Sequence, residues 1–233
     1  MHTPTSLWGT WTVNQRLLAR LLWNPGMDAS VLLDDYFRLY YPTTSARTRQ
    51  FYGHLQDATL NIKAFKHHVW VGGTVYHCLM GKLNEKAPNL FPMQHLHYEP
   101  FHPPINDAPD VVEMIHSMRL ARQEINDALL ECRDEKEQTR LLDDERRFAY
   151  GEAMYLFIYH LVRVSTFDRE GRADLARREF EALDREATRL RGMVDIVQVA
   201  FRHANGKNGL DATQAEPTYE FYKSKYGPKP AKP

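Results

Sequence analysis

The sequence predicts an all-α fold: an antiparallel helical bundle of about six helices with one long irregular loop. Apolar residues recur at spacings of three and four along six separate stretches, which is the pattern of amphipathic helices. Capping residues and Pro or Gly breakers separate those stretches. Between residues 66 and 109 the periodicity stops, and prolines, histidines and aromatic residues take its place. That segment is expected to be an ordered loop insertion, since its aromatic content argues against disorder.

Three predicted helices precede residue 66. The first ends at Asn24-Pro25-Gly26, and Asp28 then stands where its carboxylate can accept from the free N–H groups of the second helix. Pro42 interrupts the chain before the third helix. The candidates for the N-cap of that helix are Thr43, Thr44 and Ser45. Because isolated helices of this size are marginal in water, all three need neighbours to cover their apolar faces.

The central helix is predicted over residues 140–167, whose apolar positions form a broad face. Two acidic residues, Glu145 and Glu152, lie two turns apart on that face. Since a buried charge is costly unless it is paired, both are expected to find Arg or Tyr partners on neighbouring helices. The acidic pairs Asp34-Asp35 and Asp143-Asp144 are expected instead to form exposed ion pairs with nearby arginines.

Two more helices flank the central one. A fourth helix starts at Asp107 or at Asp110, and Asp110 has Glu113 three residues later, as in a capping box. A charged link over 131–140 joins it to the central helix. After a turn at 168–171, a last helix keeps its apolar positions in register from 176 to 201. We therefore predict a single helical domain over 1–201 and a flexible tail over 202–233.

The composition of the chain argues against two classes of binding partner, nucleic acid and membrane. The 233 residues carry 30 Lys and Arg against 30 Asp and Glu, so no net charge would recruit nucleic acid or an anionic membrane, and neither is expected. The most apolar run stops at His160, far short of the roughly 20 residues that span a bilayer. The N-terminus shows no secretory signal, and both Cys78 and Cys132 are expected to be reduced. The compartment is left open.

Two spacings in the sequence weakly suggest a metal site. Glu113 and His116 have the Glu-x-x-His spacing of carboxylate-bridged di-iron bundles, but the second copy, Glu99 and His102, lies among prolines that forbid a helical turn. His95-x-His97 could hold one edge of a zinc site on an extended segment. Surface polar residues and solvent-facing loop histidines explain both patterns more simply. We therefore predict no metal and no cofactor.

Several stretches of the sequence resemble one known protein family. The stretch LLARLLWNPGMDASVLLDDYFRLYY resembles the helical region that follows the barrel in a glycosidase-like family, domain of unknown function 4838, whose architecture is similar to that of alpha-glucuronidases. The matching residues are Leu22, Trp23, Asn24, Pro25, Asp28, Leu32, Leu33, Tyr36, Tyr40 and Tyr41. Later segments LFPMQHLHYEPF, ARQEINDAL and RLLDDERRFAYGEAMY are also similar to that region. Pro42 departs from the family, which usually has Gly there.

The resemblance implies a non-catalytic module. A barrel of this kind takes roughly 250 residues and carries its catalytic groups at the ends of its strands, and no strand-helix alternation precedes Trp8. We expect this chain to be the C-terminal helical portion of a glycoside-hydrolase-like protein, with no catalytic residue of its own. It would pack on the catalytic barrel, and its segment 91–104 would lean over the carbohydrate site. The predicted ligand-binding residues are His95, His97, Tyr98, Glu99 and His102.

Two alternatives belong to other classes. The first is a free-standing interaction module that forms a homodimer through an apolar helix face, because an N-terminal helix without a preceding domain could expose Trp8, Trp11 and Leu18. The second is a metal-dependent helical-bundle enzyme, which the Glu-x-x-His spacing suggests.

Overall fold

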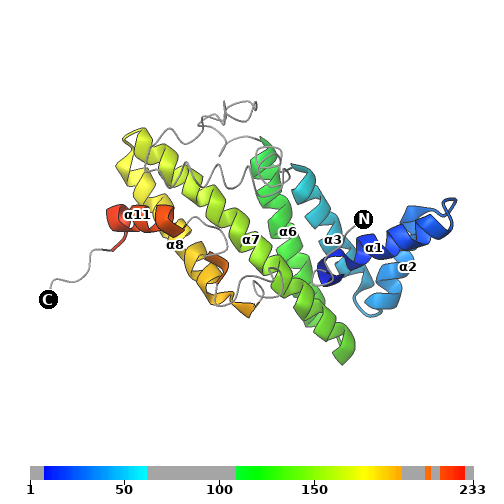
Figure 1. Cartoon of the computed structure of the whole chain (residues 1–233). Helices are drawn as coiled ribbons and strands as arrows, with labels where there is room; N and C mark the ends of the chain where they lie inside the picture. Colours follow the sequence, from blue (N-terminus) through cyan, green and yellow to red (C-terminus); the bar gives the residue numbers. More distant parts are fainter. Residues whose placement is uncertain (1–7, 62–108, 196–207, 211–215, 229–233) are drawn as a thin grey trace. The chain divides into compact units, whose positions relative to one another are not determined.

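A computed structural model describes residues 8–61, 109–195, 208–210 and 216–228. These residues contain seven named α-helices and no strand, so the all-α prediction is confirmed, with one helix beyond the predicted six (Figure 1). The helices are α1 (Trp8–Trp23), α2 (Ala29–Tyr40), α3 (Ser45–Asn61), α6 (Pro109–Glu131), α7 (Glu135–Arg169), α8 (Ala173–Gly192) and α11 (Glu216–Tyr226). Within the described residues, no helix combines the length and the apolar character needed to cross a membrane.

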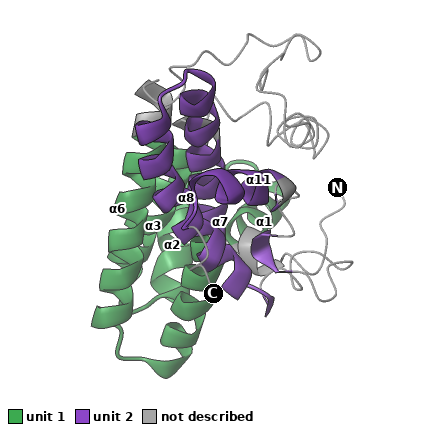
Figure 2. Ribbon diagram, turned by 90° about the vertical axis from the view of Figure 1, so that its left-hand side faces the viewer, with its two compact units in different colours: residues 1–61, 113–149 green, residues 62–112, 150–233 purple. Residues whose placement is uncertain are grey.

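The chain divides into two compact units, which Figure 2 colours separately. Unit 1 comprises residues 1–61 and 113–149, and unit 2 comprises residues 62–112 and 150–233. Helix α7 supplies its first half to unit 1 and its second half to unit 2. The predicted loop insertion over 66–109 lies outside the described residues except for Pro109, the first residue of α6. Proline suits that position, because its missing N–H has no partner there in any helix.

In unit 1, α1 contacts α2 and α2 contacts α3. The turn between α1 and α2 forms as predicted: Asn24 Oδ1 accepts from Gly26 N at 3.2 Å. Asp28 caps α2, with extended backbone (φ −73°, ψ 121°) and its Oδ1 2.7 Å from the Ser30 N–H that donates to it. At the other end of α2, the Arg140 guanidinium donates to the Tyr40 carbonyl at 2.5 Å. A cation near the last carbonyls of a helix also favours its dipole.

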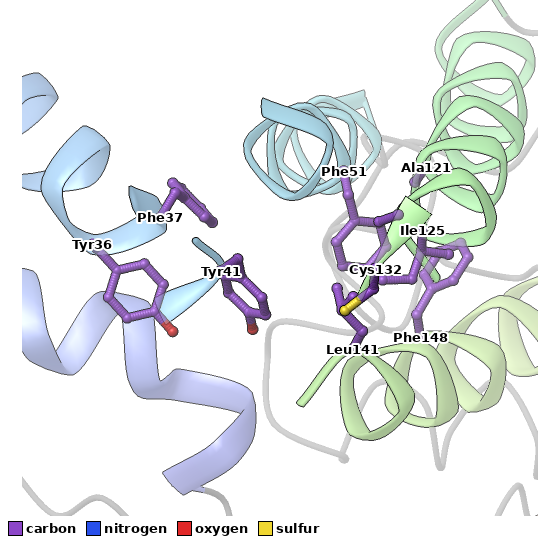
Figure 3. Packing of buried hydrophobic residues seen from close by; sticks show 10 residues of the cluster. Tyr36, Phe37, Tyr41, Phe51, Ala121, Ile125, Cys132, Leu141 and Phe148 are labelled. Carbon is purple, nitrogen blue, oxygen red and sulfur yellow. The ribbon is translucent and has the colours of Figure 1, made fainter. Parts of the chain in front are cut away.

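The core of unit 1 is a cluster from α2, α3, α6 and α7 (Figure 3). The Phe51 ring of α3 meets the Phe148 ring of α7 edge-on, with centroids 5.4 Å apart. Ile125 and Leu141 lie beside them and have no exposed surface. The remaining buried members are Tyr36, Phe37, Tyr41, Ala121, Ala128 and Cys132. Burying side chains of this size contributes roughly 1.5–3 kcal/mol each, so this cluster is the main source of stability in the unit.

In unit 2, the apolar face predicted for the last helix is buried as far as Leu190. Phe180 of α8 stacks on Tyr219 of α11, with ring centroids 6.1 Å apart. Tyr219 also lies 6.4 Å, centroid to centroid, from Phe157 of α7. Leu156, on the apolar face of the predicted central helix, is only half-buried, whereas its neighbour Phe157 has no exposed surface.

The segment 202–233 was predicted to be a flexible tail, but its described residues include a packed helix. Its residues 216–226 form α11, which packs against α8. Tyr219 and Leu210 are completely buried. A Cβ at Gly209 would lie 2.7 Å from the Leu190 carbonyl oxygen, so only glycine fits that approach. The prediction relied on the Lys and Pro content of the segment and overlooked three aromatic residues at helical spacing, which are Tyr219, Tyr222 and Tyr226.

Two helix boundaries also differ from the prediction. α7 begins at Glu135, inside the predicted charged link, because Asp134 Oδ1 accepts from Glu137 N at 2.8 Å and so caps the helix. α8 ends at Gly192, before the predicted residue 201. The turn at 168–171 is confirmed: Gly171 adopts φ 72°, and the Arg172 N–H donates to the Phe167 carbonyl at 2.9 Å.

Candidate functional site

The predicted ligand-binding residues all fall in one segment that lies outside the described residues. They are His95, His97, Tyr98, Glu99 and His102. The histidines at 67, 68 and 77 fall in the same segment. Their binding role therefore stays a prediction.

Of the metal signals, one pair can be located. Glu113 and His116 are both exposed on α6, as surface polar residues are. Among the described residues, no three His, Cys, Asp or Glu side chains gather at metal-binding distance. Cys132 is a free, buried thiol that lies in the core of unit 1.

The surface of unit 1 exposes large apolar residues where α1 ends. Trp23, the last residue of α1, is 92% exposed, and Leu22 beside it is 74% exposed. Both belong to the Leu-Trp-Asn-Pro stretch that carries the family resemblance. Because the Asn24 side chain and carbonyl accept from Gly26 and Met27, the chain leaves Trp23 through an ordered turn. An exposed Trp is a common anchor of protein interfaces.

α7 also supplies a half-buried carboxylate, Asp144, which bonds to two tyrosines rather than to an arginine, and the sequence did not predict this. Tyr41 OH donates to Asp144 Oδ2, and Tyr52 OH donates to Asp144 Oδ1 at 3.0 Å. Burial raises the pKa of Asp144 to about 6, although both tyrosine hydrogen bonds act in the opposite direction. Burial also raises the pKa of Tyr41 and of Tyr52 well above the usual value. This site can therefore hold or release a proton near neutral pH without a cationic partner bonded to Asp144 in the described residues.

The expectation that Asp144 forms an exposed ion pair is therefore wrong, whereas it is confirmed for Asp34, Asp35 and Asp143. Those three pair with Arg49, Arg38 and Arg147 at 2.9–3.0 Å. The position of Asp144 relative to the apolar residues of α7 was the signal that could have predicted this. Asp144 lies three residues after Leu141 and four before Phe148, so all three share one helix face, and both neighbours are core residues.

A second unpredicted carboxylate holds the start of α3. Glu137 of α7 has no exposed surface. Its Oε2 accepts from Thr43 N at 3.0 Å and Thr43 Oγ1 at 2.8 Å. Its Oε1 accepts from Thr44 N at 2.8 Å and Thr44 Oγ1 at 2.6 Å. The threonines predicted as caps thus donate to a carboxylate from a distant helix, which occupies the positively polarised N-terminus of α3.

The predicted partners of the two central acids are found, one in each unit. In unit 1, Arg122 of α6 reaches Glu145 at 2.5 Å. In unit 2, Arg189 of α8 donates to Glu152 at 2.8 Å, and Glu152 is only 8% exposed. Both acids are therefore explained by structural ion pairs with arginine, as expected.

A network of ion pairs and hydrogen bonds joins α7 to α8 in unit 2. His160 Nδ1 and Arg163 Nε lie 2.5 Å and 2.9 Å from Glu179 Oε1. Burial pushes the pKa of Glu179 upward, but the hydrogen bonds from His160 and Arg163 outweigh it and hold that pKa below its usual value of 4.5. Arg163 also donates to Tyr159 OH at 3.2 Å. The contacts bind α7 to α8 through one carboxylate.

A cavity of ≈ 540 Å³ lies between α8 and the end of α11 in unit 2. Its lining combines the cations Arg177 and Lys225 with the acids Glu181 and Asp184. Two of these charges are engaged inside the protein: Lys225 contacts Asp168, and Tyr219 OH donates to Asp184. The cavity is therefore an open, mixed-charge hollow in which half of the charged groups serve the packing of α11.

Comparisons of this chain with protein-family models, with curated proteins and with solved structures found no match. The resemblance to the glycosidase-like family therefore stays a prediction, and the site has to be interpreted from its own geometry.

Proposed function

We propose that this chain is a non-catalytic helical module of a glycoside-hydrolase-like protein, which packs on a catalytic barrel domain. The observation that carries the proposal is the exposed Trp23 at the end of α1. A tryptophan that is 92% exposed leaves a large apolar surface in water, and an ordered turn follows it in the chain. The resemblance puts this stretch directly after the barrel.

The acidic residues of α7 support a structural role. A glycosidase needs two carboxyl groups that face a sugar. On α7, the carboxylates of Glu137, Glu145 and Glu152 bond to threonines or arginines of the surrounding helices. These contacts account for acids that would otherwise be candidates for catalysis.

The presence of a catalytic barrel in the parent protein is tested first by reading the coding sequence upstream of this chain. The frame upstream of Met1 is expected to encode alternating strands and helices. That region, expressed separately, is expected to bind this chain, and Trp23→Ser is expected to weaken the binding about thirtyfold, as for a central interface tryptophan. Leu130→Ser is the matched control, because Leu130 is 76% exposed on α6 and lies outside the turn. A stop codon directly upstream, or no binding, would overturn the proposal.

The carbohydrate part of the proposal concerns the loop residues. In the full-length parent, changing His95, His97 and Tyr98 singly to Ala is expected to raise KM for a glycan substrate. Unchanged kinetics in all three variants would remove the loop from the proposed carbohydrate site and leave the docking role standing.

A second candidate function is a free-standing module that dimerises through an apolar helix face. The specific observation is Leu18, which is 38% exposed although it lies in the middle of α1. Molecular mass measured by light scattering at several concentrations separates a dimer from a dilution-stable monomer.

A further inference from the structure

Three polar side chains of α7 hold the junction between α2 and α3, which is residues 40–44. Glu137, Arg140 and Asp144 belong to the half of α7 that lies in unit 1. Glu137 accepts from threonine N–H and hydroxyl groups of the junction, and Arg140 donates to the last carbonyl of α2 at 2.5 Å. Asp144 Oδ2 accepts from the hydroxyl of Tyr41. The junction is therefore bonded to α7 at three separate points.

Asp144 also joins α7 to α3, because its Oδ1 accepts from the hydroxyl of Tyr52 at 3.0 Å. Tyr41, which is the C-cap residue of α2, is only 1% exposed. The rings of both tyrosines pack on Phe37, with centroids 6.3 Å and 5.4 Å from it. Three helices therefore meet at one carboxylate. Separating the end of α2 from α7 would break a hydrogen bond and let water reach the charge.

Asp144 has no ion pair within the described residues, although charged groups surround it. The arginines of the neighbouring helices have other partners, and the pairs are Arg147 with Asp143, Arg122 of α6 with Glu145, Arg140 with the Tyr40 carbonyl, and Arg16 of α1 with the Tyr36 ring. Through space, Arg147 favours the ionised form of Asp144, whereas Asp143 opposes it. The titratable groups that face Asp144 from α2 and α3 are the phenols of Tyr36, Tyr41 and Tyr52. Protonation of Asp144 would therefore deprive no cation of its partner.

The proton on Asp144 influences whether the junction is closed, as in this structure, or open. Burial raises the pKa of Asp144 to about 6 in the closed form, and the hydrogen bonds from Tyr41 and Tyr52 offset this only in part. In an open form, in which water reaches the carboxyl, the pKa is the usual 3.8. The closed form therefore keeps its full stability below pH 3.8 and loses stability as the pH rises through about 6. Between pH 5 and 7.5, the ratio of open to closed junction should rise about tenfold.

We propose that Asp144 is a pH-sensitive switch on this junction: when it is ionised, the last turn of α2 opens from α7 more readily, and when it is protonated, the junction stays closed. The opening is local, because α2 has only 12 residues and a short helix separates from a domain more easily than the core unfolds. The switch lies within unit 1 and is independent of the proposed docking on a barrel.

Hydrogen exchange of single amides, measured by NMR from pH 5 to 7.5, tests the switch. Each rate is divided by the intrinsic rate at the same pH, which gives the ratio of open to closed forms. The Tyr41 N–H reports on the junction, because it donates to the Phe37 carbonyl at 2.8 Å in the closed form. Its ratio is expected to rise about tenfold. The amide of Ile125, a core residue of α6, reports on global unfolding and is expected to exchange more slowly throughout.

Two variants assign the effect to Asp144. Asp144→Asn removes the charge, so the tenfold rise is expected to disappear. Asp143→Asn is the matched control, because that neighbour is exposed and pairs with Arg147. The rise is expected to remain in the control.

A second measurement covers the case in which Asp144→Asn disturbs the packing. The NMR signal of the Asp144 carboxyl carbon follows its titration, and the midpoint is expected near pH 6. Tyr52→Phe removes a donor that favours the ionised form, so the midpoint is expected to move to higher pH.

Four outcomes would overturn the proposal. They are a Tyr41 exchange ratio that does not rise with pH, a Tyr41 amide that exchanges only together with Ile125, a rise that Asp144→Asn leaves unchanged, and an Asp144 carboxyl that titrates at its usual pKa in the folded chain.

Discussion

The acids packed between helices in unit 1 and in unit 2 bond to different kinds of partner. Glu137 and Glu152 are buried, and Asp144 and Glu179 are half-buried. In unit 1, Glu137 and Asp144 accept from threonine and tyrosine hydroxyls and from backbone N–H groups, all of which are neutral. In unit 2, Glu152 and Glu179 lie against Arg189, Arg163 and His160. Hydrogen bonds satisfy a buried carboxylate in both cases, but only the arginines also balance its charge.

The difference between the two kinds of partner appears in the pKa of Asp144 and in that of Glu179. Burial dominates at Asp144 and raises its pKa to about 6. At Glu179, burial is outweighed by His160 and Arg163, and the pKa falls below 4.5. Ionisation of Asp144 therefore opposes folding, whereas ionisation of Glu179 supports it.

The largest effect is expected at Glu137. Glu137→Ala would leave the Thr43 and Thr44 donors at the start of α3 without their acceptor, at a cost of about 3 kcal/mol or more in the free energy of unfolding. Glu135→Ala, on the exposed side of the same turn, is expected to change it by less than about 0.5 kcal/mol. Urea unfolding measures both, and equal losses would show that the carboxylate does not hold α3.

An effect of opposite sign is expected at Asp144. Asp144→Asn keeps a side chain that can bond to Tyr41 and Tyr52 but removes the negative charge from a poorly solvated position. At pH 7.5 it should stabilise the protein by up to about 3 kcal/mol, which corresponds to a shift of about two pKa units.

The pH dependence of that gain follows from the sign of the shift. The folded pKa of Asp144 lies above the unfolded value of 3.8, so its contribution to stability is complete below pH 3.8 and is lost as the pH rises through about 6. The advantage of Asp144→Asn should therefore vanish near pH 4. Thermal unfolding from pH 4 to 8 checks this, with Asp143→Asn as the exposed control. A gain that is equal at all pH values would contradict an unfavourable ionisation of Asp144 in the folded protein.

The arginine pair of unit 2 should have an intermediate effect. Arg189→Ala removes the guanidinium from Glu152 and from Glu186, both at 2.8 Å, and is expected to destabilise the protein by about 1–3 kcal/mol. Arg172→Ala is the control, because its pair with Glu170 is exposed and contributes about 0–1 kcal/mol. If both variants unfold at the same urea concentration, the burial of Glu152 has no energetic consequence.

The smallest effect is expected at Glu179. Its folded pKa lies below 4.5, so the stability it contributes is present above pH 4.5 and is lost as the pH falls through the lower folded value. Glu179→Gln should cost about 1 kcal/mol at pH 7, and the difference should close in acid. Glu181→Gln, exposed on the same helix, should match the wild type throughout. A difference that widens in acid would reverse the contrast with Asp144.

Local patterns were reliable where a residue acts within its own helix or turn. The cap at Asp28, the turn at Gly171 and the buried stripe of α8 were predictable, because capping geometry and helical spacing involve residues only a few positions apart. The partners of Glu145 and Glu152 were predictable as a type, because a buried acid needs a donor. Which arginine supplies it was not predictable.

The sequence by itself determined the all-α fold found in the described residues, where most of the predicted helices begin and end, and that two acids on the central helix need partners. Tertiary structure alone decided that Asp144 accepts from two tyrosines, that Glu137 caps α3, and that α11 packs on α8. The physical reason is distance along the chain. Glu137 meets Thr44 across 93 residues and Asp144 meets Tyr52 across 92, and such contacts depend on how helices pack rather than on periodicity within one helix.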